Sequence, residues 1–235
     1  MVYYGVMFVV KAAIFDLDHT LFDRYATIGI LVPQLRKHFD LNDGITDEYF
    51  IQEMTYGDKN FVHKGWQGIY NHLLSKGIFK TIPTFEEYTE IVLRHFRHIA
   101  VKYDYSIGVL RELKAKGYKV GLITNGTSEL QYKKLGMLEL TDLFDEIIVS
   151  GDTPYEKPDK RIFLMMAEKM GVKPEEMMYI GDHPLNDIEG SRSAGMIPVW
   201  VKTTGTWIFP EIEKPELQVE TVEEIPDLIE KINNR

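Results

Sequence analysis

Residues 16–21 read Asp16-Leu17-Asp18-His19-Thr20-Leu21 and directly follow an apolar run at residues 9–15. The run is rich in β-branched and bulky side chains, which is typical of a buried β-strand. Desolvating two carboxylates so close together is costly unless a positive charge lies between them. Mg²⁺ is the natural candidate, because it is a hard cation that prefers oxygen ligands. The stretch therefore predicts a metal-assisted site at the carboxyl end of a central strand.

The composition is that of an ordinary soluble globular protein, with 44% hydrophobic and 27% charged residues. A formal net charge of −9 argues against a nucleic-acid partner, and the absence of cysteine excludes disulfides and thiolate chemistry. No apolar stretch is long enough to span a bilayer, so no membrane partner is expected. Residues 1–10 are apolar but lack the basic segment and cleavage site of a signal peptide. We expect a cytoplasmic protein whose native start is Met1 or Met7.

The second half of the chain alternates short apolar strands with helices. Strands are expected at residues 119–123, 146–150, 177–180 and 197–201, and helices at 107–116, 128–135, 161–170, 185–193 and 222–232. Short continuous apolar strands that alternate with helices imply a parallel sheet covered on both faces. We therefore predict a Rossmann-like, doubly wound α/β core.

A helical insertion separates the first strand from this alternation. Apolar residues recur with helical spacing between residues 25 and 102, in stripes over residues 31–39, 61–73 and 88–99. Pro83-Thr84 precedes two glutamates, which predicts a helix start because acids in the first turn interact favourably with the helix dipole. The insertion is therefore expected to be α-helical.

We predict an α/β core domain of residues 1–23 and 103–235 and an α-helical cap domain of residues 24–102. A cap that closes over the carboxyl edge of a sheet excludes water and favours small molecules over proteins as substrates. Several side chains are candidate substrate contacts, although packing or solvation explains each of them at least as well: Phe22, His63, Lys64, Trp66, Tyr70, Arg94 and Arg97.

Polar residues follow the predicted strands at four places, of which the acidic stretch described above is the first. Thr124-Asn125 follows the second strand and offers a hydroxyl, an amide and backbone N–H groups that suit a phosphate oxyanion. Lys157-Pro158-Asp159 comes just before a helix, where Lys157 would point a positive charge into the site. Gly181-Asp182 ends the fourth strand, and Asp187 follows five residues later as a further source of oxygen ligands.

Each of these features also has an ordinary structural explanation. Asp-x-Asp and Thr-Asn-Gly often form turns, Lys-Pro-Asp is common in loops, and an acid such as Asp187 can cap a helix. Their joint order argues for function, because all four follow strands of one predicted parallel sheet. The carboxyl ends of such strands converge on one crevice. One shared site explains the four features more simply than four coincidences.

In this order the residues resemble the motifs of the haloacid dehalogenase (HAD) superfamily, in its phosphatase-like subgroup with a helical cap inserted after the first motif. The resemblance covers nearly the whole chain. The matching positions are Asp16-x-Asp18-x-Thr20, Thr124, Lys157 and Gly181-Asp182-x-x-x-x-Asp187.

The resemblance implies a role for each matching residue. Asp16 would attack phosphorus and form an aspartyl-phosphate, and Asp18 would act as general acid and then as general base. Thr124 and Lys157 would hold the phosphoryl oxygens, beside the amide of Asn125. The implied Mg²⁺ ligands are the carboxylate of Asp16, the main-chain carbonyl of Asp18 and the carboxylate of Asp182, with Asp187 behind them or acting through water.

The implied activity is Mg²⁺-dependent hydrolysis of a small phosphorylated metabolite, such as a sugar phosphate, a phosphoglycolate-like acid or a nucleoside monophosphate. Asp18 favours a phosphatase over a 2-haloacid dehalogenase, since the dehalogenating members generally lack an acid there and do not need Mg²⁺. A phosphoryl-transferring mutase of the β-phosphoglucomutase type shares the motifs and the cap, and it stays an open alternative. A non-catalytic phosphoryl-binding protein is disfavoured, because it would be expected to have lost at least one motif residue.

Overall fold

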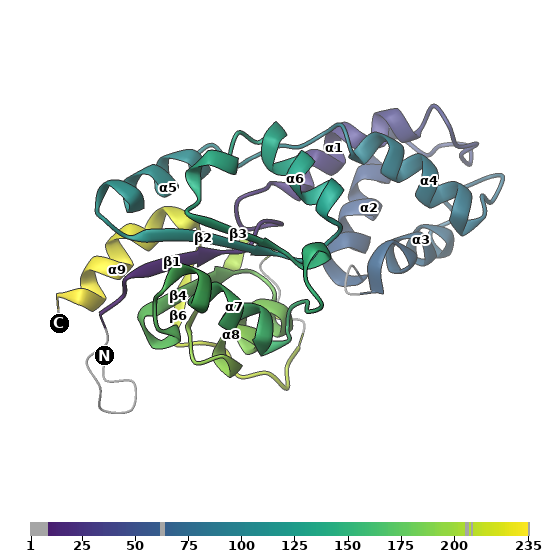
Figure 1. Cartoon of the computed structure of the whole chain (residues 1–235). Helices are drawn as coiled ribbons and strands as arrows, with labels where there is room; N and C mark the ends of the chain where they lie inside the picture. Colours follow the sequence, from purple (N-terminus) through teal and green to yellow (C-terminus); the bar gives the residue numbers. More distant parts are fainter. Residues whose placement is uncertain (1–8, 62–63, 205–206, 208, 235) are drawn as a thin grey trace. The chain divides into compact units, whose positions relative to one another are not determined.

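The chain divides into two compact units, one of them formed from both ends of the sequence. The first unit comprises Met1–Phe22 and Lys102–Arg235, and the second comprises Asp23–Val101. Figure 1 shows a sheet with helices on both faces in the first unit and a group of helices in the second. The predicted α/β fold with an inserted helical segment is thereby confirmed. The computed structural model describes residues 9–61, 64–204, 207 and 209–234.

The described part of the first unit contains a six-stranded parallel sheet with the strand order β3-β2-β1-β4-β5-β6. β1 lies at the centre, where Phe15 pairs with Leu122 of β2 and with Ile180 of β4. The order runs outward from β1 in both directions, and open α/β sheets bind their ligands at the carboxyl ends of the strands at such a point. The strands are β1 Ala12–Phe15, β2 Lys119–Thr124, β3 Glu146–Val149, β4 Met177–Gly181, β5 Ile197–Val201 and β6 Leu217–Val219.

The sixth strand is the one element of the sheet that the sequence pattern does not reveal. Leu217–Val219 is only three residues long and follows a loop that contains two prolines, Pro210 and Pro215. Three residues are too few for an alternating pattern to stand out. Parallel pairing with β5 defines this segment as a strand, so its neighbour decides its structure.

Helices cover both faces of the sheet, with α7 and α8 on the face opposite α5 (Figure 1). The predicted helix at residues 185–193 differs in detail, because it begins as a π-helical segment, Pro184–Glu189, before α8. The predicted terminal helix likewise begins with a 3₁₀ turn, Val222–Glu224. The α-helices of this unit are α5 Ser106–Ala115, α6 Ser128–Met137, α7 Lys160–Met170, α8 Gly190–Ser193 and α9 Ile225–Asn233.

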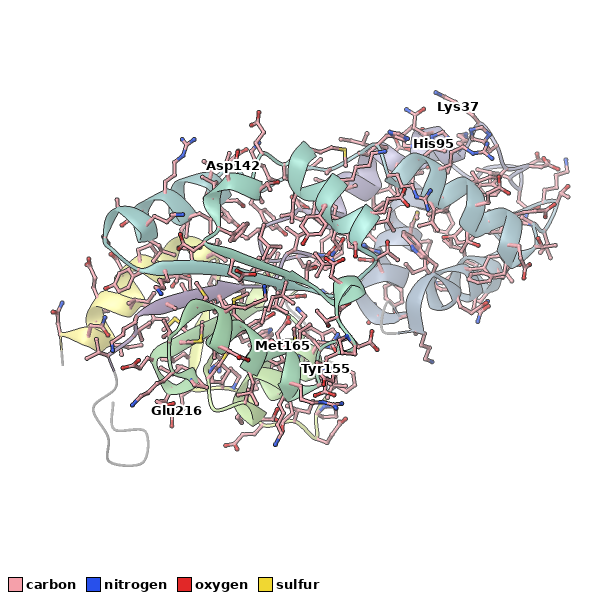
Figure 2. All side chains as sticks on the ribbon, viewed as in Figure 1. Lys37, His95, Asp142, Tyr155, Met165 and Glu216 are labelled. Carbon is pink, nitrogen blue, oxygen red and sulfur yellow. The ribbon has the colours of Figure 1, made fainter. Side chains whose placement is uncertain are left out.

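The hydrophobic core under α7 fixes which side chains of the central strands face this helix. Phe163 of α7 packs edge-on against Tyr179 of β4, with ring centroids 4.9 Å apart, and Ile14 of β1 belongs to the same cluster. Tyr155 and Met165 are partly buried against it (Figure 2). Burying side chains of this size stabilises the fold by about 1.5–3 kcal/mol each.

The inserted unit consists of α1 Arg24–Leu35, α2 Asp47–Phe61, α3 Gly65–Ser75 and α4 Phe85–Phe96. Thr84 caps α4 as expected, since its hydroxyl accepts from the N–H of Glu87 and the Glu87 carboxylate accepts from the N–H of Thr84. The helical stripe expected over residues 61–73 is shared between two helices, because Phe61 belongs to α2 and α3 begins at Gly65, whose φ is 63°. The candidate contact His63 lies outside the described residues.

Arg24 organises the core of the inserted unit. Its Nε donates to the Asp58 carboxylate at 2.8 Å, and both side chains are buried. The guanidinium carbon lies 5.1 Å from the ring centroids of both Trp66 and Phe96. The hydroxyl of Tyr70 donates to the carbonyl of Pro83 at 2.6 Å. Trp66 and Tyr70 therefore pack within this unit. None of the helices among the described residues has the length and apolarity needed to cross a bilayer.

Candidate active site

Three central strands end in polar residues at one edge of the sheet. β1, β2 and β4 are adjacent and parallel, so their carboxyl ends lie side by side. Asp16 follows β1, Thr124 closes β2 and Asp182 follows β4. The N–H of Asp16 donates to the carbonyl of Ile180 at 2.9 Å, so the hydrogen bonding between β1 and β4 continues as far as Asp16.

Lys157 lies at the centre of this group and is 4% exposed. Its Nζ donates to Oδ1 of Asp16 at 2.6 Å, to Oδ1 of Asp187 at 2.6 Å and to the Tyr179 hydroxyl at 3.0 Å. Burial acts to lower the pKa of this ammonium, but Asp16 and Asp187 outweigh burial and hold it well above its ordinary value. Lys157 therefore remains a fixed positive charge in a desolvated position.

Asp16, Asp182 and Asp187 form a buried acidic cluster, with one carboxylate oxygen from each lying within 4.8 Å of the others. Burial raises the pKa of Asp16 to about 7, against the attraction of Lys157 and with a further rise from Asp187. Burial also raises the pKa of Asp182 well above its ordinary value, together with repulsion from Asp187 and Asp16. One lysine does not compensate three buried carboxylates. Their oxygen donors fit a hard divalent cation.

Gly181 and the π-helical turn together place the Asp187 carboxylate. A Cβ on residue 181 would lie 2.5 Å from Cγ of Asp187, so only glycine leaves room for this side chain. The N–H of His183 donates to Oδ2 of Asp187 at 2.9 Å. The indole N–H of Trp200 donates to the carbonyl of Asp182 at 3.0 Å and fastens the same loop to β5.

Asn125 joins the loop after β2 to the loop that carries Lys157. Its side-chain oxygen accepts from the N–H of Lys157, and its side-chain nitrogen donates to the carbonyl of Lys157, both at 2.9 Å. These two bonds fix the main chain beneath the Lys157 ammonium. The side chain expected to contact phosphate thus has both of its polar groups engaged by the protein.

The carboxylate of Asp18 contacts helix α6. The Nζ of Lys134 donates to both carboxylate oxygens of Asp18, each at 2.8 Å. The side-chain nitrogen of Gln131 lies 3.3 Å from Oδ2 of Asp18 and also donates to the Thr124 hydroxyl. The Asp18 side chain is partly exposed, whereas that of Asp16 is buried. The two acids of the opening stretch therefore have different surroundings.

Comparison with known proteins gives the same family as the motifs. The model of the haloacid dehalogenase-like hydrolases matches residues 13–201. This chain belongs to the haloacid dehalogenase-like hydrolases. The HAD-hydrolase YfnB from Bacillus subtilis has the same fold, with a TM-score of 0.73 at 23% sequence identity over 94% of this chain and 99% of that one.

Relatives of this HAD chain include proteins that match it over most of its length. A glyceraldehyde 3-phosphate phosphatase from Methanocaldococcus jannaschii is 28% identical over 96% of this chain and 98% of its own. A phosphoglycolate phosphatase from Aquifex aeolicus is 31% identical over 79% of this chain and 81% of its own. A glyceraldehyde 3-phosphate phosphatase from Methanopyrus kandleri is 38% identical, but over only 43% of each chain.

Three residues of this HAD site lie outside the motifs read from the sequence: Tyr179, Gln131 and Lys134. Tyr179 stands two residues before Gly181, so it points to the same face of β4. The sequence shows it as one of several apolar residues in a buried strand. Gln131 and Lys134 are three residues apart on α6, a spacing that places both on one face of the helix. That spacing is the signal available, and it does not show which face is buried.

Proposed function

We propose that this chain is a Mg²⁺-dependent phosphatase that hydrolyses small organic phosphate monoesters through an aspartyl-phosphate on Asp16. Relatives that match most of the chain are named as phosphatases of glyceraldehyde 3-phosphate and phosphoglycolate. The family membership and these names support a phosphoric monoester hydrolase. The site geometry supports the residue roles.

The observation that carries the proposal is the position of Asp16 between Lys157 and the other two acids. Lys157 donates to Asp16 at 2.6 Å, so it stands where a phosphoryl group attached to Asp16 would place its oxygens. Attack of an anionic nucleophile on an anionic ester requires such a positive charge beside the reacting atoms. The buried setting strengthens this interaction, because water does not screen it.

The proposed reaction has two halves. In the first, a carboxylate oxygen of Asp16 attacks phosphorus as the bond from phosphorus to the ester oxygen breaks, and Asp18 gives that oxygen a proton. In the second, Asp18 removes a proton from a water molecule that attacks phosphorus, and the Asp16 carboxylate leaves. Covalent catalysis divides one difficult displacement into two easier ones. A positioned general acid contributes about 10²–10⁴-fold.

The donor set suits Mg²⁺, held by the carboxylates of Asp16 and Asp182 and by the main-chain carbonyl of Asp18. Both oxygens of Asp187 accept hydrogen bonds, from Lys157 and from His183, which supports a position behind the metal ligands. When bound, the cation would offset the negative charge of the phosphoryl group and of the carboxylates. Thr124 would donate its hydroxyl to a phosphoryl oxygen, and Asn125 would act by holding the main chain of Lys157.

Phosphate release from p-nitrophenyl phosphate, glyceraldehyde 3-phosphate and phosphoglycolate tests the activity with Mg²⁺ and with EDTA. Asp16→Asn should abolish phosphate release. The matched control Asp142→Asn replaces an exposed acid and should release phosphate as wild type does. Acid quenching with ³²P-labelled substrate should leave label on the wild-type protein and none on Asp16→Asn. Full activity in EDTA or in Asp16→Asn would overturn the proposal. Isomerisation of a sugar phosphate without phosphate release would identify a mutase instead.

A further inference from the structure

Helix α6 contributes two buried polar side chains that belong to none of the strand-end motifs. Gln131 and Lys134 are 3% and 6% exposed, whereas their neighbours Tyr132 and Lys133 are exposed. Polar side chains of this length are costly to bury unless their hydrogen bonds are made. Both contact residues of the proposed reaction, so a role in that reaction would explain why they are buried.

Lys134 fixes the orientation of the Asp18 carboxylate. Its Nζ lies 2.8 Å from each of the two carboxylate oxygens, a two-point contact that defines the direction of the carboxyl plane. The same Nζ lies 4.6 Å from the ring centroid of Phe22, which limits the positions open to the ammonium. A contact to one oxygen alone would leave the carboxylate free to rotate.

Gln131 fixes the proton of the Thr124 hydroxyl. Its amide nitrogen faces the carbonyl of Asn125 at 3.0 Å and Oδ2 of Asp18 at 3.3 Å. The carbonyl is a pure acceptor, so the group that faces it must be the NH₂ and not the amide oxygen. The same nitrogen donates to the Thr124 hydroxyl. A hydroxyl that accepts from Gln131 keeps its own proton to donate elsewhere, as a phosphoryl oxygen requires.

We propose that Lys134 and Gln131 are positioning residues of the reaction. Lys134 aims the Asp18 carboxyl at the leaving oxygen, and Gln131 holds the Thr124 hydroxyl ready to donate to the phosphoryl group. This inference rests on the proposed function. Loss of Lys134 should damage proton donation, and loss of Gln131 should damage phosphoryl binding. A misplacement of 1 Å in a reacting group can cost about 10²-fold in rate.

Two substrates with different leaving groups separate positioning from simple stability. Lys134→Met should reduce kcat/KM for glycerol 2-phosphate by about 10²-fold, because an alkoxide needs the proton from Asp18. It should reduce kcat/KM for p-nitrophenyl phosphate by less than about fivefold, because nitrophenolate leaves with little proton donation and the later attack of water, which is common to both substrates, does not enter kcat/KM. Lys134→Arg should restore most of the loss, and Lys133→Met, on the exposed side of the same helix, should behave as wild type.

Combination with Asp18→Asn gives a second readout. If Lys134 acts through Asp18, Lys134→Met should add little to the loss that Asp18→Asn already causes. Gln131→Leu should instead raise KM for both substrates by similar factors, since Thr124 meets the phosphoryl group of each. Equal losses of kcat/KM on both substrates in Lys134→Met, or full additivity with Asp18→Asn, would overturn the inference.

The wild-type protein separates failure of this inference from failure of the proposed function. If wild type hydrolyses neither substrate, the proposed function is wrong, and the contact itself is then tested by carboxyl ¹³C NMR. The Asp18 resonance, assigned by its loss in Asp18→Asn, should shift in Lys134→Met and stay in place in Lys133→Met. A resonance that does not move in Lys134→Met would refute the positioning of Asp18.

Discussion

Replacing Asp16 by asparagine should stabilise the metal-free protein at neutral pH, although it removes the proposed nucleophile. Asp16 is buried, and burial raises its pKa from 3.8 to about 7 in spite of the nearby Lys157. Ionising this carboxyl in the folded protein is therefore unfavourable. Asparagine has no such charge and retains an oxygen that can accept from Lys157, which donates to Asp16 Oδ1 at 2.6 Å.

The magnitude follows from the two pKa values. At pH values between 3.8 and about 7 the folded protein binds more protons than the unfolded chain. The free energy of unfolding therefore falls as the pH rises through this range. A gap of about three pH units corresponds to about 4 kcal/mol, at 1.36 kcal/mol per unit. Part of this penalty is already present at pH 5. The stability advantage of Asp16→Asn should therefore grow by about 3 kcal/mol between pH 5 and pH 8.

Urea unfolding in EDTA, carried out for both proteins across this pH range, measures the difference directly. Asp142→Asn replaces an exposed acid (Figure 2) and should give a nearly flat difference curve. A flat curve for Asp16→Asn, or an advantage that shrinks as the pH rises, would refute the reasoning. Adding Mg²⁺ should favour wild type again, by about 2.7 kcal/mol at a hundredfold excess over its Kd.

Three further substitutions test the packing of charged groups. Lys157→Met leaves buried acids uncompensated and should lower the free energy of urea unfolding at neutral pH by about 3–5 kcal/mol, whereas Lys169→Met, at an exposed ion pair, should change it little. Gly181→Ala should displace Asp187 and cost about 1–3 kcal/mol together with phosphatase activity; an active variant of wild-type Tm would contradict this. Arg24→Met should destabilise the inserted unit by about 3–5 kcal/mol, seen as faster hydrogen exchange in α2; unchanged exchange would show that Asp58 does not need its partner.

The strand ends could be read from the sequence because their pattern is local. Short apolar runs within strands of four to six residues mark β1 to β5, and Asp16, Thr124 and Asp182 take their places from the strands at whose ends they lie. The parallel order then brings the ends of neighbouring strands to one edge of the sheet. The sequence pattern did not predict β6 or the π-helical turn at Pro184–Glu189, since each depends on what the segment packs against rather than on its own pattern.

Lys133 and Lys134 show what a local sequence pattern does not determine. They are adjacent lysines in one helix and look equivalent in the sequence, yet one is exposed and the other is buried against Asp18. A shift of one residue turns a helical side chain by about 100°, so the orientation of α6 on the sheet decides which lysine enters the site. Tyr179 is a similar case, because its hydroxyl reaches Lys157 from within an apolar strand.

The sequence alone therefore determined the α/β class, the order of the strand ends and the residue types that carry the chemistry. These follow from short-range patterns of polarity and from the geometry of parallel strands. The tertiary structure decided which carboxylate each lysine contacts, since Lys157 bonds to Asp16 and Asp187, and Lys134 to Asp18. These pairings join residues 30, 116 and 141 positions apart and depend on how helices and loops pack on the sheet, which no local pattern encodes.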